Sequence, residues 1–133
     1  MLKSTLFSLC TILSFSTLAF EMSPEQETFI TQICQENPAD FRPHINGYGL
    51  VGPRTKVNPS ARVAPTAIVC QNAAVLDQAV IFEGARIFGN ARVDGAARVF
   101  GRAQVAGNAW ITDVAQIYDF ASIQGCSEIS GYS

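Results

Sequence analysis

Residues 51–133 read VGPRTK VNPSAR VAPTAI VCQNAA VLDQAV IFEGAR IFGNAR VDGAAR VFGRAQ VAGNAW ITDVAQ IYDFAS IQGCSE ISGYS when divided into groups of six. From Val51 to Ile129 the first residue of every group is Val or Ile, and from Ala61 to Ala121 the fifth is always Ala. A period of six fits neither a helix, with 3.6 residues per turn, nor a single strand, with a period of 2. The chain must therefore turn once per group, with the aliphatic and the small residue pointing inward.

The corners between these short strands carry turn-forming residues. The third place holds Pro in the first three groups and Gly in six later ones, and Asn stands in the fourth place at Asn72, Asn90 and Asn108. Pro followed by a residue that tolerates positive φ suits a type II turn. We therefore expect positive φ in the fourth place, and strained or differently shaped corners where it holds Val114 and Phe120.

This pattern resembles the hexapeptide-repeat family, in which an aliphatic residue recurs every six residues and a small residue follows it four places later. The resemblance covers nearly all of residues 51–133. It implies an all-β fold, a left-handed parallel β-helix with three hexapeptides per coil and coils about 4.8 Å apart. The groups of six would make between four and five coils. The left-handed winding is implied by the resemblance alone, since most crossovers are right-handed.

Three groups per coil place residues that are eighteen apart directly above one another. Phe82, Phe100 and Tyr118 then form an aromatic column on one face, beside Val80. Such a column can stabilise neighbouring coils by stacking. It can equally be an apolar interface with another molecule, and the family resemblance implies a homotrimer assembled through flat faces.

The chain before the repeats divides into two segments. Residues 1–19 are typical of a secretory signal peptide cleaved after Ala19, with an uncleaved membrane anchor as the alternative. In residues 20–50 a short helix is expected to begin after Ser23 and to end near Asn37. We therefore expect a secreted or periplasmic protein with no stable membrane insertion after cleavage.

The expected helix has an apolar face. Four residues share it at helical spacing: Phe29, Ile30, Ile33 and Cys34. Because the second coil is apolar on all three sides, we expect the helix to lie against it. A disulfide between Cys34 and Cys70 is then geometrically possible, whereas Cys126 lies too far from Cys70. The alternative is three reduced cysteines that act as small apolar residues.

The charges do not indicate a nucleic-acid partner. The formal net charge is -2 and the pI is about 5.2, whereas nucleic-acid binding normally requires a basic surface. Arg86, Arg92 and Arg98 occupy successive groups and so point from three different faces. Arg92 should stack on Trp110 in a cation–π contact and flank Asp94, which we expect at the surface like the other corner acids.

Candidate catalytic residues are scarce. Acyltransferases of the resembled family use a histidine base, and its carbonic anhydrases bind zinc through three histidines. This chain has a single histidine, His44, which precedes the repeats. We assign no catalytic, metal-binding or cofactor-binding residue.

The function expected from the sequence is that of a secreted β-solenoid scaffold or binding protein without catalytic activity, which self-associates through the column of Phe82, Phe100 and Tyr118 and the neighbouring Val80. Two alternatives remain open: an acyltransferase-like enzyme of the resembled family, and a polysaccharide-binding module that uses the aromatic column. The expected partners are further copies of the chain and a polysaccharide or another protein.

Overall fold

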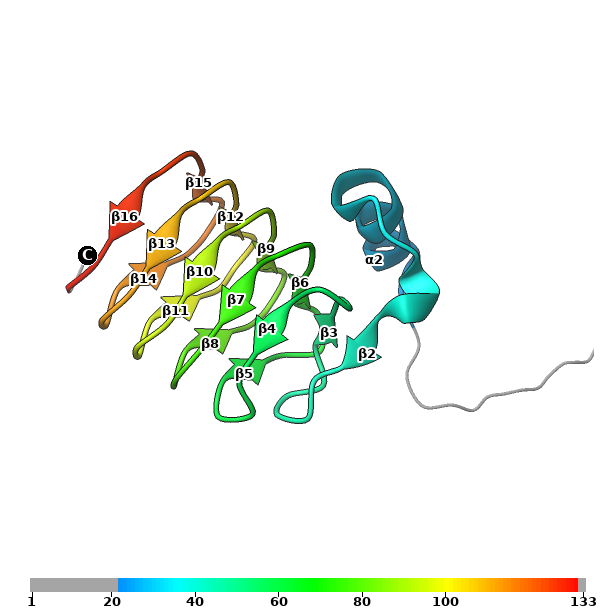
Figure 1. Cartoon of the computed structure of the whole chain (residues 1–133), viewed down its shortest axis with the longest axis horizontal. Helices are drawn as coiled ribbons and strands as arrows, with labels where there is room; N and C mark the ends of the chain where they lie inside the picture. The colour runs from blue at the N-terminus through cyan, green and yellow to red at the C-terminus, as the bar shows by residue number, and fades with distance from the viewer. Residues whose placement is uncertain (1–21, 132–133) are drawn as a thin grey trace, which may run out of the picture.

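The chain forms a solenoid of stacked coils with a helical segment against one end (Figure 1). A computed structural model describes residues 22–131, so the expected signal segment lies outside the described residues. These residues make a parallel β-solenoid of about 4 turns preceded by one short α-helix, which confirms the predicted fold class. None of the helices within residues 22–131 has the length and apolarity that a membrane crossing requires.

Each group of six contributes one two-residue strand, and every third strand along the chain joins the same sheet. The first sheet holds β4 (Lys56–Val57), β7 (Ala74–Val75), β10 (Arg92–Val93), β13 (Trp110–Ile111) and β16 (Glu128–Ile129). The second holds β5 (Arg62–Val63), β8 (Val80–Ile81), β11 (Arg98–Val99) and β14 (Gln116–Ile117). The third holds β2 (Arg42–Pro43), β3 (Leu50–Val51), β6 (Ile68–Val69), β9 (Arg86–Ile87), β12 (Gln104–Val105) and β15 (Ser122–Ile123). We call their outer surfaces the Trp110 face, the aromatic face and the helix face.

The register between coils is eighteen residues throughout the repeats. Arg92 on β10 lies between Ala74 and Trp110, as the sequence predicts. The main-chain N–H of Arg92 donates to the carbonyl oxygen of Ala109 at 2.9 Å. Because β9, β10 and β11 belong to different sheets, the three successive arginines do point from three faces.

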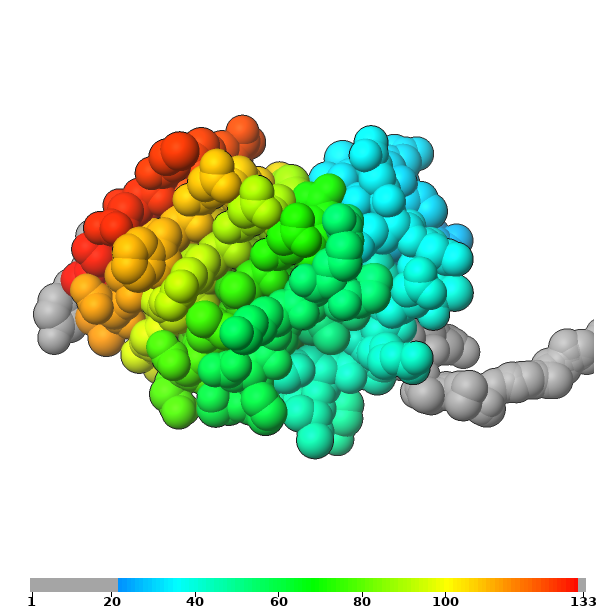
Figure 2. Space-filling view, viewed as in Figure 1, coloured from blue at the N-terminus to red at the C-terminus, as the bar shows by residue number. Residues whose placement is uncertain are grey.

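The interior is a column of Val, Ile and Ala side chains. From Ala61 to Ala115 the first and fifth residues of each group are at most 1 % exposed. Ala in the fifth place leaves room for the aliphatic side chains that enter the narrow interior from the other two walls. In the space-filling view the coils form diagonal bands from green to red, with the cyan N-terminal segment packed at the green end (Figure 2).

The corners differ from the sequence-based prediction. Positive φ falls on the third place of the group, for example at Gly89 (φ 70°) and Gly107 (φ 69°), and not on the fourth. The prediction of strain at Val114 and Phe120 is therefore wrong, since neither residue has a positive φ. Asn72, Asn90 and Asn108 form one column in the fourth place. The coils are joined there by main-chain hydrogen bonds: the N–H of Asn72 donates to Gly89 O at 2.9 Å.

Several polar residues also adopt positive φ in the third place, and their side chains bind the next coil. Asp77 Oδ2 accepts from Gly95 N at 3.2 Å, and Glu83 Oε1 accepts from Gly101 N at 2.7 Å. The left-handed conformation costs a residue with a Cβ roughly 1–2 kcal/mol. The hydrogen bond to the neighbouring coil offsets part of that cost.

The N-terminal helix is shorter than expected. Helix α2 (Pro24–Phe29) begins at Ser23, whose hydroxyl accepts from Gln26 N, and continues as the π-helix η2 (Ile30–Cys34). It ends where Gln35 adopts φ 57°, before Asn37, which caps the short 3-10 helix η3 (Pro38–Asp40) instead. The first and last residues of η2, Ile30 and Cys34, are buried. Ile33, expected on the contact face, is 47 % exposed.

We predict that Gly107→Ala destabilises the solenoid more than Gly125→Ala. Both glycines have positive φ, but a Cβ at residue 107 would lie 2.7 Å from Gly125 N, whereas a Cβ at residue 125 meets nothing within 4 Å. The second substitution should cost only the left-handed backbone penalty of about 1–2 kcal/mol. Urea unfolding of both variants measures the difference, and equal free energies of unfolding would contradict the close approach of the coils.

Candidate functional site

The structure brings the three predicted aromatic residues together on the aromatic face. The ring centroids of Phe82 and Phe100 are 4.9 Å apart with an angle of 8° between the ring planes. Phe100 and Tyr118 are 5.6 Å apart at 17°. The rings therefore stack face to face along the solenoid axis and add to the stability of neighbouring coils.

This stacking decides which parts of the rings a partner can reach. Because the rings cover one another's faces, the column presents mainly ring edges to the outside. Tyr118, at the end of the stack, is 52 % exposed, and Val80 and Phe82 are half-buried. Arg98 and Gln116 form an exposed polar column beside it. The aromatic face is thus an apolar ridge with a polar border.

The helix face is covered at its N-terminal end. Ile30 and Cys34 pack with Phe41, Leu50, Ile68 and Cys70 in a second apolar cluster outside the solenoid core. Phe29 meets Phe88 edge to face at 5.5 Å between ring centroids, and the guanidinium of Arg86 lies 4.7 Å from the centre of the Phe29 ring. The helix therefore removes one side of the apolar second coil from water, as the sequence analysis expects.

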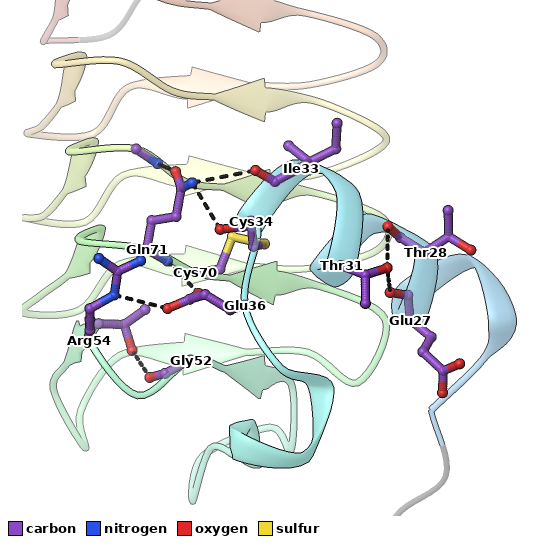
Figure 3. The surroundings of a disulfide bond; sticks show 12 residues. Glu27, Thr28, Thr31, Ile33, Cys34, Glu36, Gly52, Arg54, Cys70 and Gln71 are labelled. Atoms are coloured by element: carbon purple, nitrogen blue, oxygen red, sulfur yellow. Dashed lines mark hydrogen bonds and ion pairs between the residues drawn. A yellow bond between two sulfur atoms is a disulfide. The ribbon is translucent and has the colours of Figure 1, made fainter.

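A disulfide fixes this contact. Cys34 and Cys70 are bonded, with their Cα atoms 6.0 Å apart, and Cys126 is a free, exposed thiol. Around the bridge, Glu36 accepts from Gln71 N at 3.1 Å and pairs with Arg54 Nε at 3.0 Å (Figure 3). The Gln71 side chain donates to Cys34 O and accepts from Gly89 N. One glutamine thereby ties the N-terminal segment to two successive coils.

The bridge also bears on metal binding. Cys34, Cys70 and Glu36 are the one set of three potential metal ligands within 4.8 Å of one another among residues 22–131. The two sulfur atoms form a disulfide, and metals bind cysteine as the thiolate. This set is accordingly not a metal site in the oxidised protein.

A groove runs between the start of the N-terminal helix and one corner of the solenoid. Its volume is about 1040 Å³, and its walls include Glu25, Glu83, Arg86 and Arg102. Burial lowers the pKa of the Arg86 guanidinium, the Glu25 carboxylate opposes that shift, and nearby Arg102 adds to it. With two acidic and two basic side chains in its walls, the groove has no net preference for an anion or a cation.

On the Trp110 face, Asp94 is buried, and its predicted place at the surface is wrong. Its side chain is 6 % exposed, and Arg92 and Trp110 both bond to it. Arg92 Nε donates to Asp94 Oδ2 at 2.7 Å, and Trp110 Nε1 donates to the same carboxylate at 3.1 Å. Burial alone would raise the pKa of Asp94, but hydrogen bonds from Thr112, Arg92 and Trp110 outweigh it and hold the pKa below its ordinary value.

His44 takes a structural position. It is 7 % exposed, and its Nε2 lies 2.9 Å from Ala61 O. A carbonyl oxygen can only accept, so Nε2 carries the proton. This hydrogen bond fastens the segment before the repeats to the first coil.

Comparisons of the chain with protein-family models, with curated proteins and with solved structures find no match.

Two features of these surfaces do not follow from the eighteen-residue register. The burial of Asp94 depends on Trp110 reaching diagonally across to the preceding coil. A signal for it exists in the sequence, since Asp94 has Arg92 two residues before it and Thr112 eighteen residues after it. The groove depends on where the helix docks, for which the repeat gives no register.

We predict that replacing both Cys34 and Cys70 by Ser lowers the free energy of unfolding by about 2–4 kcal/mol, since the open chain gains entropy. Amide hydrogen exchange should accelerate in η2, where the bridge holds the helix. Cys126→Ser is the matched control and should change neither quantity. Unchanged exchange in the double variant would show that the apolar contacts alone hold the helix.

We predict that Asp94→Asn destabilises the protein at neutral pH and that the difference from wild type disappears in acid. A carboxyl group whose folded pKa is lowered contributes stability above its unfolded pKa, about 3.9, and loses it as the pH falls through the folded value. Urea unfolding between neutral pH and strongly acidic pH measures the effect. Asp119→Asn, at an exposed corner, is the control; a D94N deficit that persists in acid would contradict an ionic role.

Proposed function

We propose that this chain is a non-catalytic binding scaffold that associates with copies of itself through the aromatic face. The observation that carries the proposal is the partly exposed ridge of stacked Phe82, Phe100 and Tyr118 beside Val80. Exposed apolar surface with a polar border is typical of protein interfaces.

The shape of the ridge favours a protein partner over a sugar on this face. Ring edges can interdigitate with the side chains of another ridge, and flat sheet surfaces can approach closely. A sugar ring stacks on an aromatic face, and here the faces that Phe82, Phe100 and Tyr118 turn toward one another are occupied. A second copy of the chain carries a matching ridge, so a closed symmetric oligomer buries every ridge at once.

Membership of the hexapeptide-repeat family belongs to the same proposal. The repeat of six residues, with Val or Ile first and Ala fifth, supports it, as does the parallel solenoid with an eighteen-residue register. This membership favours a trimer and a left-handed winding.

Two further observations support the proposal. The disulfide between Cys34 and Cys70 suits an oxidising compartment, which agrees with secretion or export to the periplasm. The single histidine is engaged with Ala61 O, which does not favour it as the base of an acyltransferase.

We predict that Tyr118→Glu shifts the protein from oligomer to monomer, because it places a charge on the most exposed ring of the ridge. Light scattering coupled to size-exclusion chromatography over a range of concentrations measures the mass. Phe120→Glu is the matched control, since Phe120 is an 80 % exposed aromatic residue outside the stack, and it should leave the mass unchanged. A wild-type protein that stays monomeric at high concentration would refute self-association.

A further inference from the structure

The Trp110 face holds a buried carboxylate on an otherwise solvated surface. Asp94 is the one acidic residue among residues 22–131 that is buried as a whole, at 4 % exposure. Burying a charge is unfavourable unless it is paired and hydrogen-bonded. Here, donors from Arg92, Trp110 and Thr112 surround the carboxylate. Its arrangement fixes the positions of two large, partly exposed side chains.

The first of these side chains is an indole held in one orientation. Trp110 is 40 % exposed although its Nε1 is bonded to a buried group. The guanidinium of Arg92, on the preceding coil, lies 5.5 Å from the ring centre. Apart from Arg92, no aromatic or cationic group among the described residues contacts the ring.

The surroundings of the indole are polar. Arg92 is about half exposed and uses only its Nε toward Asp94, which leaves its terminal NH₂ groups as donors. Glu128 follows Trp110 in the same column on β16 and is exposed, so its carboxylate can accept hydrogen bonds. An aromatic surface with a donor on one side and an acceptor on the other differs from the apolar ridge of the aromatic face.

We propose that Trp110, Arg92 and Glu128 form a binding site for a neutral pyranose sugar within a polysaccharide. A pyranose whose substituents are all equatorial has faces lined by C–H groups and a rim of hydroxyls. The C–H face packs on the indole, and the rim hydroxyls accept from Arg92 and donate to Glu128. Asp94 is a positioning residue that keeps the indole and the guanidinium in place.

This site lies on a different face from the self-association ridge, so the two proposals stand or fall separately. Arg92, Trp110 and Glu128 lie on three successive coils of the same chain, so one chain forms the whole site. A symmetric oligomer built through the aromatic face would present several copies of the site and bind one long polysaccharide more tightly by avidity.

The experiment uses the full chain and two soluble probes, cellohexaose (β-linked glucose) and xylohexaose (β-linked xylose). Trp110 is the only tryptophan of the chain, so its fluorescence reports directly on the site. We expect a saturable change in emission during titration into the millimolar range with at least one of the two probes. Absence of any saturable change with both would overturn the proposal.

Variants then test the assignment by retardation in gels that contain hydroxyethylcellulose or soluble xylan. Trp110→Ala should weaken binding roughly tenfold, which corresponds to about 1.4 kcal/mol, while Trp110→Phe should keep part of the affinity because a ring remains. Asp94→Asn should weaken binding less and shift the tryptophan emission of the free protein. Phe120→Ala, which removes an exposed aromatic side chain outside both the ridge and the site, is the control and should bind normally.

The outcomes separate the two proposals. Retention of wild-type affinity by Trp110→Ala would overturn the sugar site, whatever the mass of the protein in solution. Loss of binding in Trp110→Ala, with an oligomeric mass unchanged from wild type and a normal melting temperature, supports it. In the hexasaccharide titration, which does not depend on avidity, loss of the response in Tyr118→Ala would place the sugar on the aromatic face and overturn the assignment.

Discussion

The main-chain hydrogen bonds between successive coils are the interaction on which the rest of the structure depends. A strand of two residues has no stability alone, and each repeat strand here exists because it pairs with a strand eighteen residues away, on both sides where it lies inside its sheet. The same pairing gives each outward side chain inside a sheet two fixed neighbours. Each face therefore consists of columns of side chains, and the members of one column occur at every eighteenth residue of the chain.

The three faces use this arrangement differently. The aromatic face stacks like with like and gains both coil stability and an apolar ridge. The helix face buries Ile68 and Cys70 under the N-terminal segment, so that its apolar second coil is satisfied within the chain. The Trp110 face instead combines unlike residues around Asp94.

The sequence predicted whatever follows from the repeat. The solenoid, the aromatic column and the position of Arg92 between Ala74 and Trp110 need only the period and the register. It did not predict the positive φ in the third place, because Pro in the third place of the early groups favours a type II turn, in which the fourth place has the positive φ. The burial of Asp94 needs a side chain that crosses diagonally between coils. The π-helical turn that leaves Ile33 exposed depends on the docking of the segment, which no repeat describes.

The third-place residues that bind the next coil also constrain how such a chain can change in length. Asp77 and Gly95 are partners only while eighteen residues separate them, as are Glu83 and Gly101. Duplicating or deleting one whole coil preserves every such pairing. A gain or loss of a single hexapeptide between Phe82 and Phe100 would keep the aliphatic and Ala side chains in the interior. It would, however, move all later residues to the adjacent face of the solenoid, so that Phe82 and Phe100 would no longer stack. Natural length variants of this protein should thus differ by multiples of eighteen residues between those two positions.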